Sequence, residues 1–410
     1  MRTLDRELPR PPVLEATLRK ITESLAMELA CPMQFAPDWS NFEWTIARAV
    51  AAMHGVSPLL SRALRWQGPA DWNRFLEEQR AHTAKRHARI DELLLRLDQR
   101  AREAGIAAVA LKGVALHSLG IYRAGDRPMA DIDLLVRPAD AEAAARILVS
   151  LDYYKSCESW KETVFTPTDD RTSGELGEHS GNNIKIELHE RISERLPRNF
   201  TDVSELVYPA RPHLGLNPYP SKASLMTHLL LHAAGSMAFR SLRLVHLNDI
   251  AGLSSRMTEQ DWDAVLESSS RVGKLWWAFP PLKLTSRYFP TRIPVRVLDS
   301  LEDDCSYLLE WTSRHRTLYD VSFSYLWVDA FPGIEWSQSV PEILGYAASR
   351  VWPGARHVAL REHLTKTQPD VADDPWSRLS QSHRIMRWVT SRPTRAQTMH
   401  AVRAALAQAQ

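Results

Sequence analysis

Cysteine, net charge and long apolar runs are all scarce in this sequence. The 410 residues include three cysteines, widely separated at Cys31, Cys157 and Cys305, and no CxxC pair indicates structural zinc or a redox dithiol. We expect the three to be buried thiols in a reducing compartment. The formal net charge is +2, from 51 basic and 49 acidic side chains, so the overall balance does not indicate a polyanionic partner such as bulk DNA.

Targeting and membrane signals are also lacking. The N-terminal residues carry charges and prolines where a signal peptide needs an apolar stretch, and no run of about 18 apolar residues occurs. The most apolar segment, 222–235, is interrupted by Lys222, His228 and His232. We expect a soluble cytoplasmic protein with no membrane partner. The Walker loop, the GxGxxG fingerprint and the GxSxG elbow are absent too, which excludes common nucleotide-binding and hydrolase classes.

Hydrophobic periodicity divides the chain into helical and mixed parts. Apolar residues at three- and four-residue spacing predict a helical N-terminal region over 1–104. Short apolar runs broken by glycines and polar turns predict a small mixed β-sheet over 105–200. Helical spacing returns over 201–365, and residues 366–410 resemble a linker followed by a basic helical tail. The predicted fold is therefore α+β, with a small mixed sheet flanked by helical regions, and predominantly helical overall.

Two aspartates, Asp131 and Asp133, lie in a predicted strand bordered by apolar residues. Alternation along the strand places both carboxylates on one face, about 7 Å apart along the chain. Because removing an unpaired carboxylate from water costs several kcal/mol, such a pair needs a partner. Hard divalent cations prefer oxygen ligands, so the pair predicts a metal site.

A third acid, Glu187, stands in another short apolar segment, IKIELHERI. Three strand-borne carboxylates are suited to two magnesium ions that hold a triphosphate and an attacking hydroxyl. An edge-strand acid that faces solvent is the alternative for Glu187, since Glu178 and Glu190 lie nearby. His189 follows Glu187 by two positions and shares its strand face, where it either lines the site or caps a neighbouring carbonyl.

The segment Leu111-Lys112-Gly113 is predicted to end a strand and begin a helix. Glycine lets the backbone approach phosphate oxygens, and both helix N-terminal amides and the lysine favour negative charge. This turn therefore predicts a phosphate-binding position upstream of the aspartates.

Together, LKGVALHSLGIYRAGDRPMADIDLLVRPAD (111–140) and IELHERI (186–192) resemble a bacterial group of uncharacterised nucleotidyltransferases in the polymerase-β-like superfamily. The resemblance covers roughly residues 40–260. It implies an enzyme that moves a nucleoside monophosphate from a nucleoside triphosphate, expected to be ATP, to a hydroxyl, a phosphate or a carboxylate of an unidentified acceptor, with release of pyrophosphate. It also implies that Asp131, Asp133 and Glu187 are the catalytic residues and hold two Mg²⁺ ions, for which Mn²⁺ can substitute.

The same resemblance implies nucleotide contacts at Lys112, Gly113 and Arg127, and the strand position of His189 adds this residue to the expected nucleotide contacts. Lys112 and Arg127 are expected to contact phosphates, and Gly113 is expected to be the glycine of the phosphate turn. One departure from the superfamily pattern is that Val114, not serine, follows the glycine, and the first aspartate comes 18 positions later.

Several alternatives stay open from the sequence. The same fold could transfer a γ-phosphoryl group, as a kinase does, or serve as a non-catalytic nucleotide-sensing or protein-binding module. His228 and His232 have the i, i+4 spacing of a zinc pair and also of core histidines, and Asp249 fits a contact between helices. A small-molecule or peptide acceptor is favoured over RNA, although the basic tail is either a solvated face or a contact for an anionic acceptor.

Overall fold

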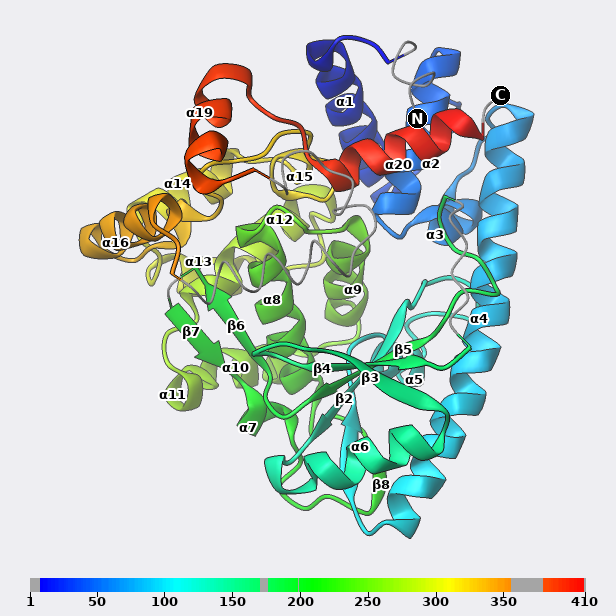
Figure 1. Ribbon diagram of the computed structural model, residues 1–410, viewed down its shortest axis with the longest axis vertical. Helices are drawn as coiled ribbons and strands as arrows, with labels where there is room; N and C mark the ends of the chain where they lie inside the picture. The colour runs from blue at the N-terminus through cyan, green and yellow to red at the C-terminus, as the bar shows by residue number, and fades with distance from the viewer. Residues whose placement is uncertain (1–7, 170–175, 198, 355–378, 409–410) are drawn as a thin grey trace.

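The structure is a computed structural model in which residues 8–169, 176–197, 199–354 and 379–408 are described (Figure 1). The N-terminal part is helical, as predicted. Its helices are α1 (Pro11–Ala30), α2 (Asn41–Met53), α3 (Ser57–Ala63) and α4 (Ala70–Glu103). Helix α2 begins after Ser40, whose hydroxyl accepts the Glu43 backbone N–H while the Glu43 carboxylate accepts the Ser40 N–H.

A mixed six-stranded sheet follows α4, with strand order β3-β4-β5-β2-β1-β8. The strands are β1 (Ala107–Ala110), β2 (Asp131–Val136), β3 (Tyr153–Glu158), β4 (Thr163–Pro167), β5 (Lys185–His189) and β8 (Gly215–Asn217). Strands β2 and β5 are parallel neighbours, whereas β1 is antiparallel to β2 and β4 is antiparallel to β5. Helix α5 (Gly113–Ser118) connects β1 to β2, and α6 (Ala141–Ser150) connects β2 to β3. The predicted α+β class is confirmed.

Four strands were not predicted, and each lacks a strong strand pattern. Strand β3 is an edge strand with several exposed polar residues, and β8 has only three residues, beyond the predicted end of the mixed part at residue 200. Strands β6 (Ser193–Leu196) and β7 (Asn199–Asp202) form a separate two-stranded hairpin. Short or edge strands bury few side chains, so their sequences need not alternate between apolar and polar residues.

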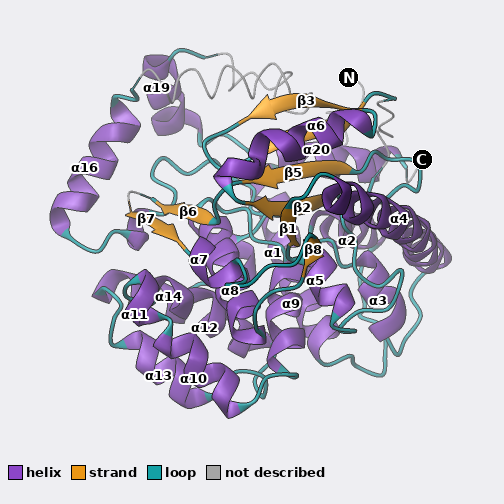
Figure 2. Cartoon of the chain, turned by 90° about the horizontal axis from the view of Figure 1, so that it is seen from below, coloured by secondary structure: helices purple, strands orange, loops and turns teal. Residues whose placement is uncertain are grey.

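Helices dominate the chain again after the sheet, as predicted. Those of eight residues or more are α8 (Lys222–Ala238), α9 (Leu244–Ser254), α10 (Glu259–Glu267), α12 (Phe279–Tyr288), α13 (Val295–Glu302), α14 (Tyr307–His315), α16 (Val340–Val351), α19 (Gln381–Ser391) and α20 (Ala396–Ala407). Figure 2 shows these helices gathered mainly on one side of the sheet. None of the described helices combines the length and the apolar character that a bilayer crossing requires.

The two faces of the sheet pack against different cores. On one face, Ile132, Leu134 and Ile186 join a buried cluster with residues of α4 and α6. On the other face, Leu135 joins the larger cluster that includes α8 and α9. Since side chains alternate along a strand, the odd-numbered acids of β2 share the face of Leu135. Asp131 and Asp133 are therefore directed toward the helical C-terminal part.

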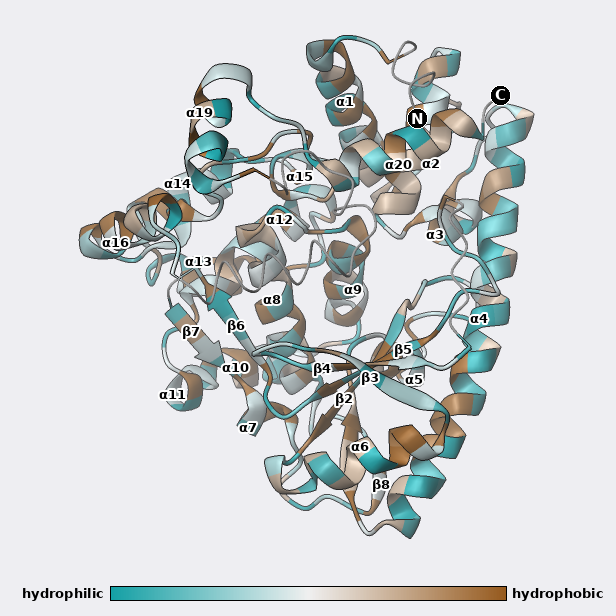
Figure 3. Cartoon of the chain, in the orientation of Figure 1, coloured by the Kyte–Doolittle hydropathy of each residue, from teal (hydrophilic) through white to brown (hydrophobic). Residues whose placement is uncertain are grey.

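Helix α4 connects the two cores. Its first turns bury Trp72 and Phe75 in the larger cluster, and its last turns bury Leu93 and Leu97 under the sheet. Figure 3 shows that hydrophilic and hydrophobic residues alternate along this helix. One amphipathic helix thus fixes the sheet relative to the N-terminal helices.

Two sequence-based expectations require correction or refinement. The expectation that the cysteines are buried is wrong, because Cys31 is exposed just after α1 and Cys157 and Cys305 are only partly buried. In the basic tail, α20 packs on α2 and buries Val402, so it is part of the fold and not a wholly solvated face. Arg395, which precedes α20, donates to the carbonyls of Arg240 and Ser322.

His54 joins three parts of the helical core. Its ring is 1% exposed, its Nδ1 accepts the Leu244 N–H at 2.9 Å, and its Nε2 lies 3.1 Å from the Ser324 hydroxyl. Burial, together with the positive charge of Arg243, lowers the pKa of His54 to about 3. The imidazole is therefore neutral in the folded protein at every pH at which the protein is ordinarily studied.

The His54→Gln substitution is expected to weaken the pH dependence of the protein's stability. In the unfolded chain a histidine takes up a proton below pH ~6.5, whereas folded His54 does so only near pH 3. Stability is therefore lost as the pH falls through this window, by about 2 kcal/mol between pH 7 and pH 5 from His54 alone. Urea unfolding at both pH values measures the loss, and an equal loss in the wild type and the variant would contradict this assignment.

Candidate active site

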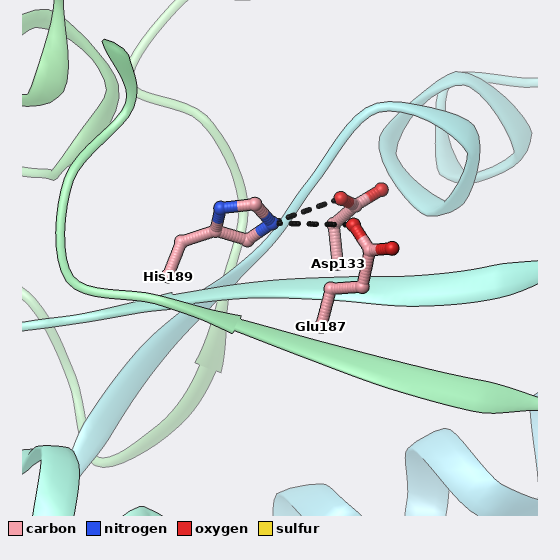
Figure 4. Close-up of side chains that lie close together, drawn as sticks. All are labelled: Asp133, Glu187 and His189. Atoms are coloured by element: carbon pink, nitrogen blue, oxygen red, sulfur yellow. Dashed lines mark hydrogen bonds and ion pairs between the residues drawn. The ribbon is translucent and has the colours of Figure 1, made fainter. Parts of the chain in front are cut away.

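Neighbouring positions on β2 and β5 bring three metal-ligating side chains together. In the parallel register Asp133 pairs with Glu187, and Leu135 pairs with His189. The ligand atoms of Asp133, Glu187 and His189 all lie within 4.8 Å of one another. Figure 4 shows the His189 Nε2 directed at both carboxylates, 3.0 Å from the Asp133 Oδ1 and 3.8 Å from the Glu187 Oε2. The side chains of Asp133 and His189 are 8% and 1% exposed, whereas that of Glu187 is 24% exposed, so the group is buried on one side and open to solvent at Glu187.

Asp131 lies two residues before Asp133 on the same strand face, and it pairs across the sheet with Lys185. Its carboxylate is not one of the three groups whose ligand atoms approach within 4.8 Å. Burial and the adjacent charge of Asp133 raise the pKa of Asp131. The structure thus places Asp131 at the border of the group, with Asp133 at its centre.

Lys112 reaches the site from the turn between β1 and α5. Its Nζ lies 2.8 Å from the Asp133 Oδ1, and its backbone N–H donates to the Tyr219 hydroxyl at 3.2 Å. The backbone of Lys112 has φ 42° and ψ −106°, a conformation that residues other than glycine rarely adopt. Such strain costs on the order of 1–3 kcal/mol and is found most often at functional sites.

The positive φ angle of this turn belongs to Lys112. Gly113 is not among the described residues with positive φ. Its lack of a side chain is needed for close packing instead. A Cβ at this position would lie 2.7 Å from the Arg127 Nη1 and 2.8 Å from the Met129 Sδ. The glycine therefore lets the turn approach the segment that leads into β2.

The charges of the site are not balanced. Although burial alone would raise it, the Lys112 ammonium and His189 hold the pKa of Asp133 well below its usual range. Burial and the charges of Asp131 and Asp133 raise the pKa of Glu187 well above its usual range. Three carboxylates thus face one close ammonium, and the arrangement favours a further positive charge beside Glu187.

Arg127 lies near the site, and its guanidinium is already bound. Its Nε and Nη2 donate to the two carboxylate oxygens of Asp249 at 2.8 and 2.7 Å, and its Nη1 donates to the Pro128 carbonyl. The Tyr122 hydroxyl donates to the same carboxylate at 2.7 Å. Asp249, on α9, thus holds the segment before β2 against the helical part.

Three histidines from α8 and α9 line the side of the site opposite the sheet. The Nδ1 of His228 lies 2.7 Å from the Tyr219 hydroxyl, and the rings of His232 and His246 meet edge to face at 4.9 Å. Burial lowers the pKa of all three below the usual histidine range. Among the described residues, His228 and His232 belong to no group of three metal ligands, so the structure does not bring together a zinc site there.

Sequence reasoning missed several residues at the site. Tyr219 lies in a proline-flanked loop and Glu162 directly before β4, so neither has a periodic pattern that would indicate its position. Arg243 directly precedes α9; it is exposed, contacts the Phe323 ring at 5.2 Å, and acts electrostatically on Asp131. An arginine at the start of a helix next to a predicted site is a weak signal that could have been noted.

Metal ions bound in pairs are used by polymerases, nucleases and phosphatases, and clustered carboxylates of the kind on β2 and β5 are suited to such ions. Residues 40–290 match the model of a family described as uncharacterised nucleotidyltransferase, and the chain belongs to this family. The resemblance noted from the sequence is thereby confirmed, and a general nucleotidyltransferase activity is supported. Neither the curated proteins nor the solved structures include a match to the chain.

Proposed function

We propose that this protein transfers a nucleoside monophosphate from a nucleoside triphosphate, most simply ATP, to a hydroxyl of an acceptor. The observation that carries the proposal is the pairing of Asp133 with Glu187 on parallel neighbouring strands, with the Lys112 ammonium 2.8 Å from Asp133. A small molecule or a peptide is the proposed class of acceptor, because the overall net charge of +2 does not indicate a polyanionic partner such as RNA.

The residues present fit a divalent cation. Oxygen ligands from Asp133 and Glu187, with Asp131 beside them, lie close to the Lys112 ammonium, and burial together with the charges of Asp131 and Asp133 raises the pKa of Glu187. When bound, Mg²⁺ or Mn²⁺ would supply charge neutralisation for the triphosphate and the acceptor oxygen. We propose Asp131, Asp133 and Glu187 as the residues that hold these ions.

The protein's own groups have defined roles in the proposed reaction. The acceptor oxygen forms a bond to the α-phosphorus, the bond from that phosphorus to the bridging oxygen breaks, and pyrophosphate leaves. The hydroxyl proton passes to a carboxylate, a role that we propose for Glu187. Lys112 at the strained turn and exposed Arg243 offer positive charge to the phosphates. Catalysis then rests mainly on positioning and charge neutralisation.

Labelled triphosphates test the proposal. The purified protein is incubated with Mg²⁺ or Mn²⁺, an extract of the source cells, and each nucleoside triphosphate labelled in turn at the α or the γ position. We expect the α label to appear on an acceptor. Appearance of the γ label alone would indicate kinase-like transfer, and transfer of neither label would indicate a non-catalytic module.

The Tyr219→Phe variant is expected to weaken nucleotide binding by about tenfold. Its hydroxyl accepts the Lys112 backbone N–H and contacts His228, so its removal frees the strained turn that carries the ammonium. Equilibrium dialysis with ATP measures the effect. Tyr208→Phe is the control, since the Tyr208 hydroxyl donates to the Ala107 carbonyl at the other end of β1. Equal weakening in both variants would argue against a specific role for Tyr219.

A further inference from the structure

We propose that His189 is itself a metal ligand, and that the site consequently prefers a first-row transition metal ion to Mg²⁺. The inference rests on the proposed function and adds to it the identity of the ion. It assigns His189 to the ion and not to the nucleotide, the contact expected from its position in the sequence.

The position of the ring supports a coordinating role. His189 comes from the same strand face as Glu187, two residues further along β5, and its Nε2 faces both the Asp133 and the Glu187 carboxylates (Figure 4). The ring is 1% exposed, so its direction is fixed by packing and not by solvent. A nitrogen and two carboxylates from adjacent strands therefore converge on one small volume.

The second ring nitrogen carries the stronger argument. The Nδ1 of His189 is buried and has no hydrogen-bond partner within the described part of the chain. The nearest carboxylate is Glu162, whose Oε2 lies 3.9 Å from this nitrogen. A histidine that binds metal nearly always donates its other ring N–H to a carboxylate, a carbonyl or water. Glu162 is placed to be that acceptor after a shift of about 1 Å.

The tautomer connects these two observations. In the arrangement seen here, Nε2 can donate to Asp133, which leaves Nδ1 as an unprotonated atom facing Glu162. Coordination requires the opposite tautomer, with a lone pair on Nε2 and the proton on Nδ1. In that tautomer the Nδ1 proton faces the Glu162 carboxylate, so the atom that lacks a partner gains one.

Ligand chemistry then sets the preference among ions. Mg²⁺ selects oxygen ligands, whereas imidazole nitrogen suits transition metal ions. A site with two carboxylates and one imidazole is therefore expected to bind Mn²⁺ more tightly than Mg²⁺, although Mn²⁺ is the weakest binder of the first-row series.

The test uses Mn²⁺ alone, without nucleotide, added to the full-length protein. Pulsed electron paramagnetic resonance detects ¹⁴N coupling when an imidazole nitrogen binds Mn²⁺, and a continuous-wave titration gives the affinity and its competition by Mg²⁺. We expect ¹⁴N coupling in the wild type and in the control His246→Gln, whose ring packs on His232. The coupling is expected to vanish in His189→Gln, and Glu162→Gln should weaken Mn²⁺ binding about tenfold.

Each outcome either supports or overturns the role of His189 as a metal ligand. Bound Mn²⁺ without ¹⁴N coupling in the wild type overturns the role of His189 and leaves the proposed function standing on its carboxylates. Coupling that persists in His189→Gln also overturns it, since another histidine is then the ligand. Absence of any bound Mn²⁺ and Mg²⁺ overturns both this inference and the proposed function. If the buried substitution prevents folding, Glu162→Gln makes the assignment, because Glu162 faces the His189 Nδ1: weakened Mn²⁺ binding in this variant supports His189 as the ligand, and unchanged binding overturns it.

Discussion

The Asp133→Asn variant is expected to fold and to lose nucleotidyl transfer by about a thousandfold or more. The substitution keeps the shape of the side chain and removes the charge on which the Lys112 ammonium and the His189 ring converge. It also removes an anionic ligand of the proposed ions. Measuring kcat/KM for transfer of the α label in the wild type and the variant gives the loss, and thermal unfolding shows whether the fold is kept.

Glu190→Gln is the matched control for this prediction. Glu190 is exposed and directly follows His189. We expect this variant to keep its activity within about twofold, because surface substitutions away from a site have small effects. A thousandfold loss in Glu190→Gln, or near-normal transfer by a folded Asp133→Asn, would mean that the paired acids of β2 and β5 are not the catalytic group.

The second large effect concerns stability. Asp249→Ala is expected to destabilise the protein by about 3–5 kcal/mol, because it leaves the buried Arg127 guanidinium without its partner. The Tyr122 hydroxyl loses its acceptor in the same variant. Urea unfolding of the wild type and the variant at neutral pH measures this difference in the free energy of unfolding.

A double variant shows whether the lost stability comes from the unpaired charge or from lost side-chain packing. Replacing both partners by apolar residues, as in Arg127→Met with Asp249→Leu, leaves no unpaired charge and is expected to recover most of the lost stability. If Asp249→Ala alone lowers the free energy of unfolding by less than about 1 kcal/mol, the Arg127–Asp249 pair does not hold α9 to the segment before β2. A stable double variant that still binds ATP normally would also show that Arg127 is not a phosphate contact.

The carboxylate face could be predicted because it depends on short-range rules. Asp131 and Asp133 alternate with apolar residues, and that alternation alone places both on one face of a strand. Glu187 could be recognised as a strand residue for the same reason. Their pairing could not be predicted, since β2 and β5 are separated by two further strands in the chain and become neighbours only in the sheet.

The contacts that could not be predicted join residues far apart in the chain. Arg127 was expected to contact phosphate, but its partner Asp249 lies 122 positions away, and no local pattern connects the two. Glu162 and Tyr219 also reach the site only through the tertiary fold. The strain at Lys112 is equally hidden, because a lysine before a glycine would suggest the glycine as the residue with positive φ.

The fate of the α-phosphorus tests the central claim most directly. Phosphorus NMR of a reaction containing ATP, Mg²⁺ or Mn²⁺, the wild-type protein and the acceptor fraction follows every phosphate species at once. The proposed reaction yields pyrophosphate and a nucleoside monophosphate ester in equal amounts, and neither forms with Asp133→Asn. Formation of ADP in their place, or pyrophosphate release that is unchanged in Asp133→Asn, would contradict nucleotidyl transfer at this site.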